Sequence, residues 1–585
     1  MEGVRIDADR RAAMYAGGLW QDQVLTDYLD VAVAASPERV AITHRSSSTG
    51  AETRLTYLEL AECVRRVASG LVRLGVAPGD VVAYQLPNCW QFSVLHLACV
   101  RIGAISNPLM PIFRQRELRF MLEFGEAKVL VVPDRFRDFD YPSVVADIRS
   151  DLPQLEQVLV IDGRDENSFE SHCLIPSSED ADLQAAVYAS RRPNADEVTQ
   201  LLYTSGTTGQ PKGVLHTGNT LLAAARSCIA HLNLTAEEVI LMASPLAHQT
   251  GFVYGLVLPL VLGARSVLQE IWSPRIAAQW IEDESVSFTM AATPFLADMA
   301  QSPELEGFNF SSFRTFVSAG APIPRVIARH AADRLGAHIA SGWGMTENSL
   351  VTTTRREDLE EKVFETDGLA HEGMEVRIRD AEGGLAGVGV EGWLQSRGAA
   401  QFVGYLKKPD LADVDAEGWF ETGDLATMDG DGYIRITGRT KDVIIRGGEN
   451  IPVVEVEELL YQHPHVSAAA IVGMPDERLG ERACCFLILS AGATLTFGEM
   501  VGYLLSKGLS KTYLPERLEI VSEMPRTASG KIQKFHSTHA EALAGDAAGS
   551  QGEEGLLSLV AGVQEIVSGA DKSPYASELV RVAGN

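Results

Sequence analysis

The 585-residue chain lacks paired cysteines, an excess of basic residues and long apolar runs. Its seven cysteines form no Cys-x-x-Cys pair, so neither a zinc site nor a disulfide framework is expected. A net charge of −28 argues against nucleic acid as a partner, but it does not prevent a local loop from binding an anion. With no apolar run of membrane-span length and no signal-peptide core, we expect a cytoplasmic protein without integral membrane association.

The tract at residues 203–213 is the most informative segment present, with three glycines, four hydroxyls and Lys212. Glycines let backbone N–H groups point at an anion, and the lysine adds positive charge. An expected strand at 198–202 precedes the tract and an expected helix at 220–229 follows it, so it suits a nucleotide triphosphate better than a plain surface loop. Gly213 follows the lysine where a Walker loop has Ser or Thr, so a metal must be held elsewhere.

Alternating strand and helix patterns from about residue 40 to 340 predict an α/β fold with largely parallel strands. The expected strands are 81–86, 129–132 and 158–161, the expected helices are 55–74 and 115–124, and 163–193 is expected to be a loop. We predict a large multi-layer N-terminal domain (1–438), a hinge (439–442), a small, mobile α+β C-terminal domain (443–540) and a flexible tail (541–585). The segment 428–433 is expected to be a turn between two short strands.

The tail contains one helical pattern, carried by Leu556, Leu559, Val560, Val563 and Val567. This helix either docks on its own domain or binds a partner, and the alternative is a disordered tail.

Three further motifs carry chemistry. In the first, at 341–347, Trp343 can stack on a base, Thr346 can bond a phosphate oxygen and Glu347 can hold magnesium. A structural turn explains this segment equally well. In the second, Asp424 can accept hydrogen bonds from ribose hydroxyls and Arg439 can neutralise phosphate, with a surface ion pair as the alternative.

The third motif is the segment 525–534, which contains Lys531. A lysine is usually a solvated surface charge. Here it follows a Ser-Gly turn and lies beside an apolar Ile532, at the edge of the small domain. From that position it could reach into a cleft and withdraw.

Taken together, these motifs resemble the adenylate-forming superfamily of acyl-CoA synthetases, peptide-synthetase adenylation domains and luciferases. The resemblance covers about residues 25–537 and rests on the segments 203–214, 344–347, 422–424, 438–442 and 447–450 and on the motif ending at Lys531. Within the superfamily the chain is most similar to ligases for medium-chain fatty acids and cyclohexanecarboxylate, through the stretches 108–113, 445–451 and 475–482.

The resemblance implies a two-step reaction with ATP, Mg²⁺ and coenzyme A, in which the small domain rotates about Lys441 between the steps. It implies four catalytic residues: Lys212, Thr346, Glu347 (also the magnesium ligand) and Lys531, the adenylation lysine. It implies nucleotide contacts from Thr204, Ser205, Gly206, Thr207, Thr208, Gly209, Lys212, Ala319, Gly320, Ala321, Pro322, Gly342, Trp343, Gly344, Met345, Thr346, Asp424, Ile436, Arg439 and Lys531. It implies coenzyme A contacts from Arg446, Gly447, Gly448 and Glu449.

Three positions depart from the family pattern on the nucleotide side. Ala319 replaces a glycine at the adenine wall, Trp343 replaces a tyrosine, and Trp393 replaces a glutamate. Each substitution taken alone is explained by neutral drift, but because all three lie on the nucleotide side we predict that together they weaken the ATP step more than the thiol step.

The expected acyl pocket is formed by His248, Gly251, Phe252, Tyr254, Gly255 and Ser318, and it is apolar and roomy. The stretch 245–252 has no carboxylate to pair with an ammonium group, which argues against an amino-acid substrate.

We therefore predict an AMP-forming acyl-CoA ligase for a hydrophobic, bulky alicyclic carboxylic acid, acting as a monomer or homodimer. Two alternatives stay open: a homologue specialised in thioesterification of preformed acyl-adenylate, and a non-catalytic binding homologue.

Overall fold

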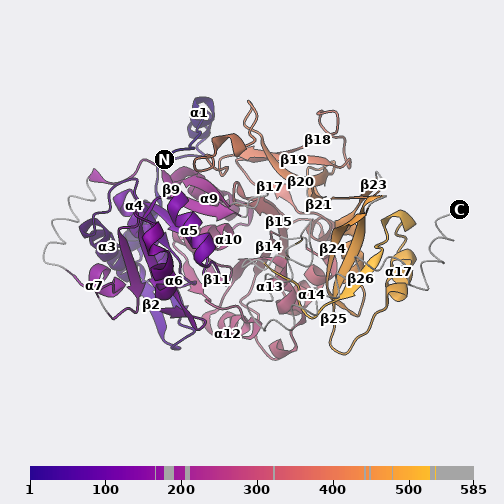
Figure 1. The fold of residues 1–585 in the computed structure, drawn as a ribbon, viewed down its shortest axis with the longest axis horizontal. Coiled ribbons are helices and arrows are strands. Elements are labelled where there is room, and N and C mark those ends of the chain that lie inside the picture. Colours follow the sequence, from indigo (N-terminus) through magenta and orange to yellow (C-terminus); the bar gives the residue numbers. More distant parts are fainter. Residues whose placement is uncertain are drawn as a thin grey trace. The chain divides into compact units, whose positions relative to one another are not determined.

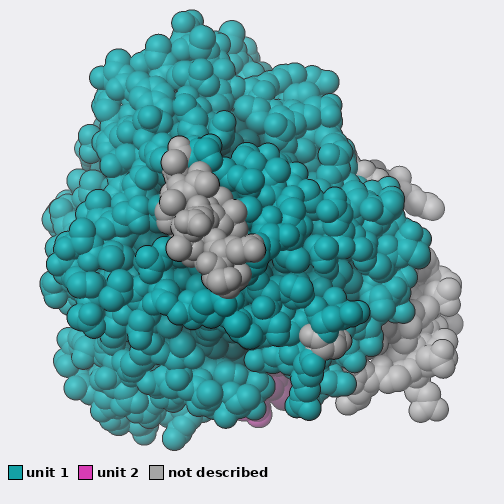
Figure 2. All heavy atoms as spheres, turned by 90° about the vertical axis from the view of Figure 1, so that its left-hand side faces the viewer, with its two compact units in different colours: residues 1–437, 528–531 teal, residues 438–527, 532–585 magenta. Residues whose placement is uncertain are grey.

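The computed structural model describes residues 1–164, 166–176, 190–204, 211–320, 323–440, 443–446, 449–476, 479–526, 532 and 534. The chain divides into two compact units: unit 1 holds residues 1–437 and 528–531 (teal in Figure 2), and unit 2 holds residues 438–527 and 532–585. The predicted class, an α/β fold with a large N-terminal and a small C-terminal domain, is confirmed.

One sheet of unit 1, which includes the strand labelled β9 in Figure 1, lies between two hydrophobic cores. Along β5 (Ala127–Pro133), Val129 and Val131 enter the first core, whereas Leu130 and Val132 enter the second. Because both faces are buried, the strand is almost continuously apolar. In spatial order the sheet is β10 (Lys212–Thr217), β9 (Val198–Thr204), β4 (Ile105–Pro108), β3 (Val81–Tyr84), β5 and β8 (Gln157–Ile161).

Helices of unit 1 cover both faces of this sheet. The first core is lined by α3 (Tyr57–Arg73), α4 (Trp90–Ile102) and α9 (Gly218–His231). The second core is lined by α5 (Gln115–Phe124) and α6 (Tyr141–Ile148).

A second sheet of unit 1 shares the first core. Its centre is parallel, because β13, β14 and β15 are paired in the same direction, and β16 is antiparallel to β15. In spatial order it is β17 (Leu369–Ala370), β16 (Ser349–Thr353), β15 (His338–Met345), β14 (Thr315–Ala319), β13 (Phe288–Ala291), β11 (Val239–Met242), β12 (Arg265–Leu268), β1 (Val40–Arg45) and β2 (Glu52–Thr56). The other helices described in this part of unit 1 are α2 (Leu25–Ala35), α10 (Gln249–Phe252), α11 (Leu258–Leu262), α12 (Pro274–Glu284), α13 (Thr293–Gln301), α14 (Arg325–Leu335) and α15 (Glu360–Glu365).

A third, antiparallel sheet consists of β18 (Met374–Arg379), β19 (Gly392–Gly398), β20 (Phe420–Met428) and β21 (Ile434–Arg439). The predicted turn at 428–433 lies between β20 and β21 and is confirmed.

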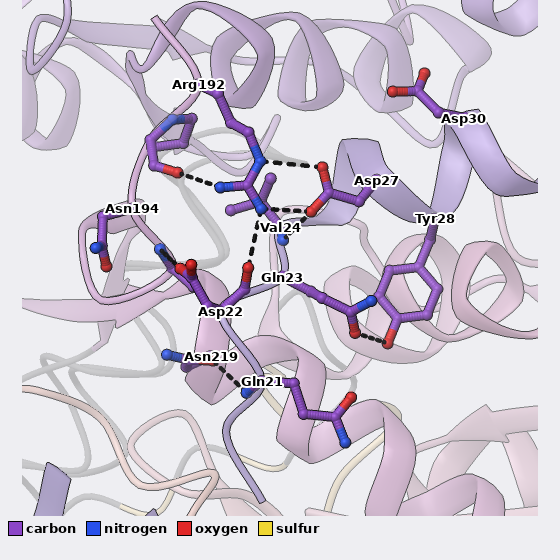
Figure 3. A network of polar contacts seen from close by, with 12 residues as sticks. Gln21, Asp22, Gln23, Val24, Asp27, Tyr28, Asp30, Arg192, Asn194 and Asn219 are labelled. Carbon is purple, nitrogen blue, oxygen red and sulfur yellow. Dashed lines mark hydrogen bonds and ion pairs between the residues drawn. The ribbon is translucent and has the colours of Figure 1, made fainter. Parts of the chain in front are cut away.

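An N-terminal arm, residues 1–24 with helix α1 (Ala8–Ala16), runs along unit 1 and is anchored beside α9 (Figure 3). Arg192 donates to both carboxylate oxygens of Asp27, at 3.2 and 2.7 Å, and to the carbonyl of Asp22 at 2.9 Å. The side chain of Asn219 accepts from the backbone N–H of Gln21 at 3.3 Å. The Asn219 bond joins the arm to the start of α9, and Arg192 joins its end to α2.

Most elements expected from the sequence are present, with three differences. The helix expected at 55–74 begins at Tyr57, because residues 52–56 pair with β1 as a strand. The loop expected at 163–193 contains the helix α7 (Phe169–Cys173), which buries its first and last side chains. The tract at 203–213 leads into strand β10, and the helix follows only after that strand.

In the part of unit 2 that the structure describes, two helices and a sheet pack around a core that includes Ile444, Val456, Ile471 and Cys485. Its strands are β22 (Ile444–Arg446), β23 (Glu449–Ile451), β24 (Val466–Asp476), β25 (Gly480–Leu489) and β26 (Arg517–Ile520), and its helices are α16 (Val453–Tyr461) and α17 (Phe497–Ser506). The predicted tail helix lies outside the described residues. Among the helices that are described, none is long and apolar enough to cross a bilayer.

Candidate active site

The predicted phosphate tract closes a hairpin between β9 and β10, in which Thr204 lies opposite Lys212. Lys212 to Thr217 pairs with β9 as a strand, so the loop connects two strands instead of meeting a helix N-terminus. Ser205, Gly206, Thr207, Thr208 and Gly209 lie outside the described residues, and their phosphate contacts stay predictions.

Glu347 and Lys212 meet at one side chain, Tyr405. The Tyr405 hydroxyl donates to Glu347 Oε1 at 2.7 Å. Lys212 Nζ lies over the same ring, 4.7 Å from its centroid. Glu347 is only 6% exposed, and burial together with the neighbouring carboxylate raises the pKa of Tyr405 far above its usual value. The tyrosine is therefore a neutral hydrogen-bond donor to this carboxylate.

His216 joins strand β10 to the turn that holds Thr346. Its Nε2 donates to the carbonyl of Thr346 at 2.8 Å, and its Nδ1 is 3.0 Å from the Thr220 hydroxyl. Complete burial lowers the pKa of His216 to about 4, so the ring is neutral at pH 7. A neutral ring carries one N–H, and the carbonyl partner places that proton on Nε2.

Asp424 is held by Trp343. The indole Nε1 of Trp343 donates to Asp424 Oδ2 at 2.8 Å, and both residues are buried. Trp343 lies near the carboxyl end of β15, beside Gly342, which is paired with Ala319 at the end of β14. Ligands of parallel sheets bind outside the carboxyl ends of the strands, so these residues occupy the expected edge.

Two family models match the chain. The model described as AMP-binding enzyme matches residues 29–406, and that described as AMP-binding enzyme C-terminal domain matches residues 455–531. The first match alone covers more than half of the chain. The chain belongs to the AMP-binding enzyme family.

Relatives of this AMP-binding enzyme support the same assignment. It is 37% identical over 529 residues to the medium-chain fatty-acid–CoA ligase of Escherichia coli (strain K12), covering 90% of this chain and 92% of that one. It is 32% identical to the 2-hydroxy-7-methoxy-5-methyl-1-naphthoate–CoA ligase of Streptomyces carzinostaticus, covering 90% and 95%. ATP-bound MatB from Rhodopseudomonas palustris has a TM-score of 0.77 at 26% identity, covering 87% of this chain and 97% of that chain.

The predicted enzyme class is confirmed: the chain is an AMP-forming acid–thiol ligase. Adenylate-forming CoA ligases use ATP and coenzyme A, with Mg²⁺ as the usual metal.

The geometry at Glu347 fits a magnesium ion, because carboxylate oxygens are ligands that Mg²⁺ prefers and the Tyr405 hydroxyl orients this carboxylate. Among the described residues no three His, Cys, Asp or Glu side chains gather into a metal cluster. An ion at Glu347 would complete its shell with phosphate oxygens and water, as Mg²⁺ does in phosphoryl-transfer enzymes. The ion would supply charge neutralisation at the phosphates.

The residues of the predicted acyl pocket lie around α10 and a π-helical turn at Val253–Val257. Phe252 is fully buried against His96 with ring centroids 4.6 Å apart, and the Tyr254 hydroxyl accepts from Leu350 N at 2.9 Å. A Cβ on Gly251 would lie 2.1 Å from the carbonyl of Pro245. This glycine therefore allows close packing.

The remaining pocket residues differ in exposure. A Cβ on Gly255 would meet Met242 Cγ at 2.4 Å, so close packing also explains this glycine. His248 caps α10 and is partly exposed. The Ser318 hydroxyl is buried and has no hydrogen-bond partner among the described residues. Which of these residues touch an acyl group stays a prediction.

On the predicted coenzyme A side, Arg446 is engaged within unit 2. It donates to Glu516 Oε1 at 2.5 Å and to the carbonyl of Leu514 at 3.2 Å. Arg439 ends β21 and is exposed, and the backbone N–H of Ile436 donates to Asp367 Oδ2 at 2.8 Å. Lys441, Gly447, Gly448, Lys531, Ala321, Pro322 and the side chain of Glu449 lie outside the described residues.

Two functional candidates were not identified from the sequence: Tyr405 and His216. A buried tyrosine or histidine among apolar residues is typical of an ordinary core, so the residue types alone did not indicate a role in the site. The signal available was the Gly404–Tyr405 pair, since a glycine before a buried aromatic residue indicates a close backbone approach.

The three departures from the family pattern have different surroundings. Trp343 contacts Asp424 directly, and Ala319 is buried beside Gly342. Trp393 is 38% exposed on β19. Of the three, Trp343 has the contact that bears most directly on nucleotide binding.

Proposed function

We propose that this enzyme activates a hydrophobic carboxylic acid with ATP and transfers the acyl group to coenzyme A. The carboxylate oxygen attacks the α-phosphorus and pyrophosphate leaves. The thiol then attacks the acyl carbonyl, AMP leaves and the thiol proton passes to solvent. The observation that supports the first step most strongly is the meeting of Lys212 and Glu347 at Tyr405, since oriented charges must offset the repulsion between carboxylate and polyphosphate.

Two acids are the candidates for the substrate. The name of the Escherichia coli relative supports a medium-chain fatty acid, and that of the Streptomyces relative supports a ring-bearing acid. Phe252 and Tyr254 are fully packed in the core, so their burial does not favour one acid over the other. The bulky alicyclic acid stays the finer proposal, and so do the monomer or homodimer state and the cytoplasmic location.

The test assays the two half-reactions separately. Linear C6–C12 acids, cyclohexanecarboxylate and an aryl acid are each supplied with ATP, Mg²⁺ and coenzyme A, and in parallel as synthetic acyl-adenylates. The expected result is AMP and thioester from the matching acid. Formation of ADP in place of AMP would contradict the adenylate route. A clear preference for linear acids would contradict the alicyclic proposal.

The same assay tests the alternatives. Turnover from supplied acyl-adenylate that greatly exceeds turnover from acid and ATP would support a thioesterification specialist, the alternative favoured by Ala319, Trp343 and Trp393. No turnover with any acid or adenylate would support a binding homologue.

Lys531 is proposed to bridge the substrate carboxylate and the α-phosphate during adenylation only. Lys531→Ala should cost roughly 3 kcal/mol or more of transition-state stabilisation in pyrophosphate exchange. Conversion of supplied acyl-adenylate to thioester should be unchanged. Equal losses in both assays would show a structural role and would argue against rotation about Lys441.

A further inference from the structure

A backbone segment outside the recognised motifs, residues 402–406, lies beside strand β10 and forms an isolated antiparallel bridge with it between Tyr405 and Val214. Val403 and Leu406 donate their backbone N–H groups to the carbonyls of Leu215 and Gly213, at 3.0 and 2.8 Å. The segment therefore continues the hairpin that begins with the predicted phosphate loop.

The same segment also holds the Gly-x-Thr-Glu turn. The backbone N–H of Phe402 donates to the carbonyl of Glu347 at 2.6 Å. The hydroxyl of Tyr405 donates to the carboxylate of the same glutamate at 2.7 Å. Main chain and side chain of Glu347 are thus both bound by 402–406, while the Tyr405 ring supports Lys212.

The N-terminal arm fixes this segment in place. Gly404 has φ +135°, and a Cβ there would lie 2.1 Å from the carbonyl oxygen of Gly3, so the arm requires a glycine. The guanidinium of Arg10 donates to the carbonyls of Phe402 and Gln401 at 3.2 and 2.5 Å. Because β10 and the N-terminal arm both bind residues 402–406, the position of Tyr405 relative to Glu347 is fixed.

We propose that Tyr405 is a positioning residue for metal–nucleotide binding, an inference that rests on the proposed function. Its hydroxyl orients the Glu347 carboxylate through a charge-assisted hydrogen bond. The hydroxyl orients the carboxylate without placing a positive charge against it, as a lysine or arginine in the same place would. The ring holds Lys212 by a cation–π contact, so one side chain sets both the anionic and the cationic group.

The test compares Tyr405→Phe, which keeps the ring, with Tyr57→Phe as a matched control. The Tyr57 hydroxyl is also buried and donates to a carbonyl, that of Ala264, at 2.7 Å. Mn²⁺ binding is measured by electron paramagnetic resonance with a non-hydrolysable ATP analogue. Pyrophosphate exchange is measured against Mg²⁺ concentration.

For Tyr405→Phe we expect the Mn²⁺ Kd and the Mg²⁺ requirement to rise roughly tenfold, the scale of one hydrogen bond to a charged group. Thioester formation from supplied acyl-adenylate should be unchanged, and Tyr57→Phe should match the wild type in all three assays. Wild-type Mn²⁺ binding by Tyr405→Phe would overturn the inference and leave the proposed function standing. Absence of AMP from the wild type would overturn the proposed function, while Mn²⁺ binding still reports on Tyr405.

A double-variant cycle tests the contact even if Tyr405→Phe is less stable. Glu347→Gln removes the charge and keeps an acceptor for the hydroxyl. If the tyrosine acts through this carboxylate, the double variant should bind Mn²⁺ no more weakly than Glu347→Gln alone. Additive losses would contradict the inference.

Discussion

Glu347 of unit 1 and Glu516 of unit 2 accept hydrogen bonds from different kinds of donor. In unit 1, Glu347 accepts a hydrogen bond from the neutral hydroxyl of Tyr405 at 2.7 Å. In unit 2, Glu516 accepts from the guanidinium of Arg446 at 2.5 Å and from the backbone N–H of Ala483 at 2.9 Å. The first contact orients a charge, and the second neutralises one.

A second pair of residues repeats the contrast. Asp424 of unit 1 accepts from the indole N–H of Trp343 at 2.8 Å, whereas Glu457 of unit 2 is paired with Lys534 at 2.5 Å. Ligand recognition needs charge that is still available, whereas a small folded unit gains from charges that are matched. The Tyr405 and Trp343 donors at the candidate site are neutral, whereas ion pairs elsewhere, such as Arg265 with Glu284 in unit 1 and Lys534 with Glu457 in unit 2, join structural elements.

The largest expected effect comes from removing the oriented charge. Glu347→Gln keeps an acceptor for Tyr405 but should lower pyrophosphate exchange roughly 100-fold or more, because metal-assisted neutralisation of the phosphates is lost. Thioester formation from supplied acyl-adenylate is the internal control. Pyrophosphate exchange at the wild-type rate by Glu347→Gln would show that Glu347 does not act in the ATP step and would contradict the contrast with Glu516.

A smaller loss is expected from removing one neutral donor. A hydrogen bond to a charged acceptor contributes about 1.5–3 kcal/mol, so Trp343→Phe should lower kcat/KM for ATP roughly 10- to 100-fold. Trp343→Tyr restores the residue usual in the family and shows whether the departure at 343 limits the ATP step. If Trp343→Phe equals the wild type in ATP titrations, the contact with Asp424 is only structural.

The smallest effect is expected in unit 2. Glu516→Gln should destabilise this unit by about 1 kcal/mol, because it removes a partly exposed ion pair but keeps an acceptor. Urea unfolding followed by a probe in unit 2 gives the stability, and pyrophosphate exchange should not change. A drop in exchange comparable to that of Glu347→Gln would mean that the ion pairs also serve the site.

Local sequence patterns were sufficient to predict the layered class, because strand and helix periods are read over a few residues. The helix expected at 115–124 has these bounds in the structure, and the strand expected at 158–161 ends at Ile161 as predicted. The start of α3 was wrong by two residues, because pairing of 52–56 with β1 is a contact between distant segments of the sheet that no local pattern contains.

The motifs of the candidate site were likewise evident in the sequence, since glycines, hydroxyls, Lys212 and Glu347 belong to recognisable spacings. Their phosphate and metal contacts stay predictions. The local sequence pattern did not indicate that a strand follows the tract at 203–213. Lys212 to Thr217 becomes a strand because it pairs with β9 on one side and with residues 403–406 on the other.

By itself, the sequence determined the family, the α/β architecture and the residue types that can bind phosphate, metal and ribose. The tertiary structure alone decided which of them share a partner. Tyr405 lies 58 residues beyond Glu347 and contacts it because the N-terminal arm and β10 hold residues 402–406 in place. A hydrogen bond depends on the final position of two atoms, and that position is set by packing across the whole unit.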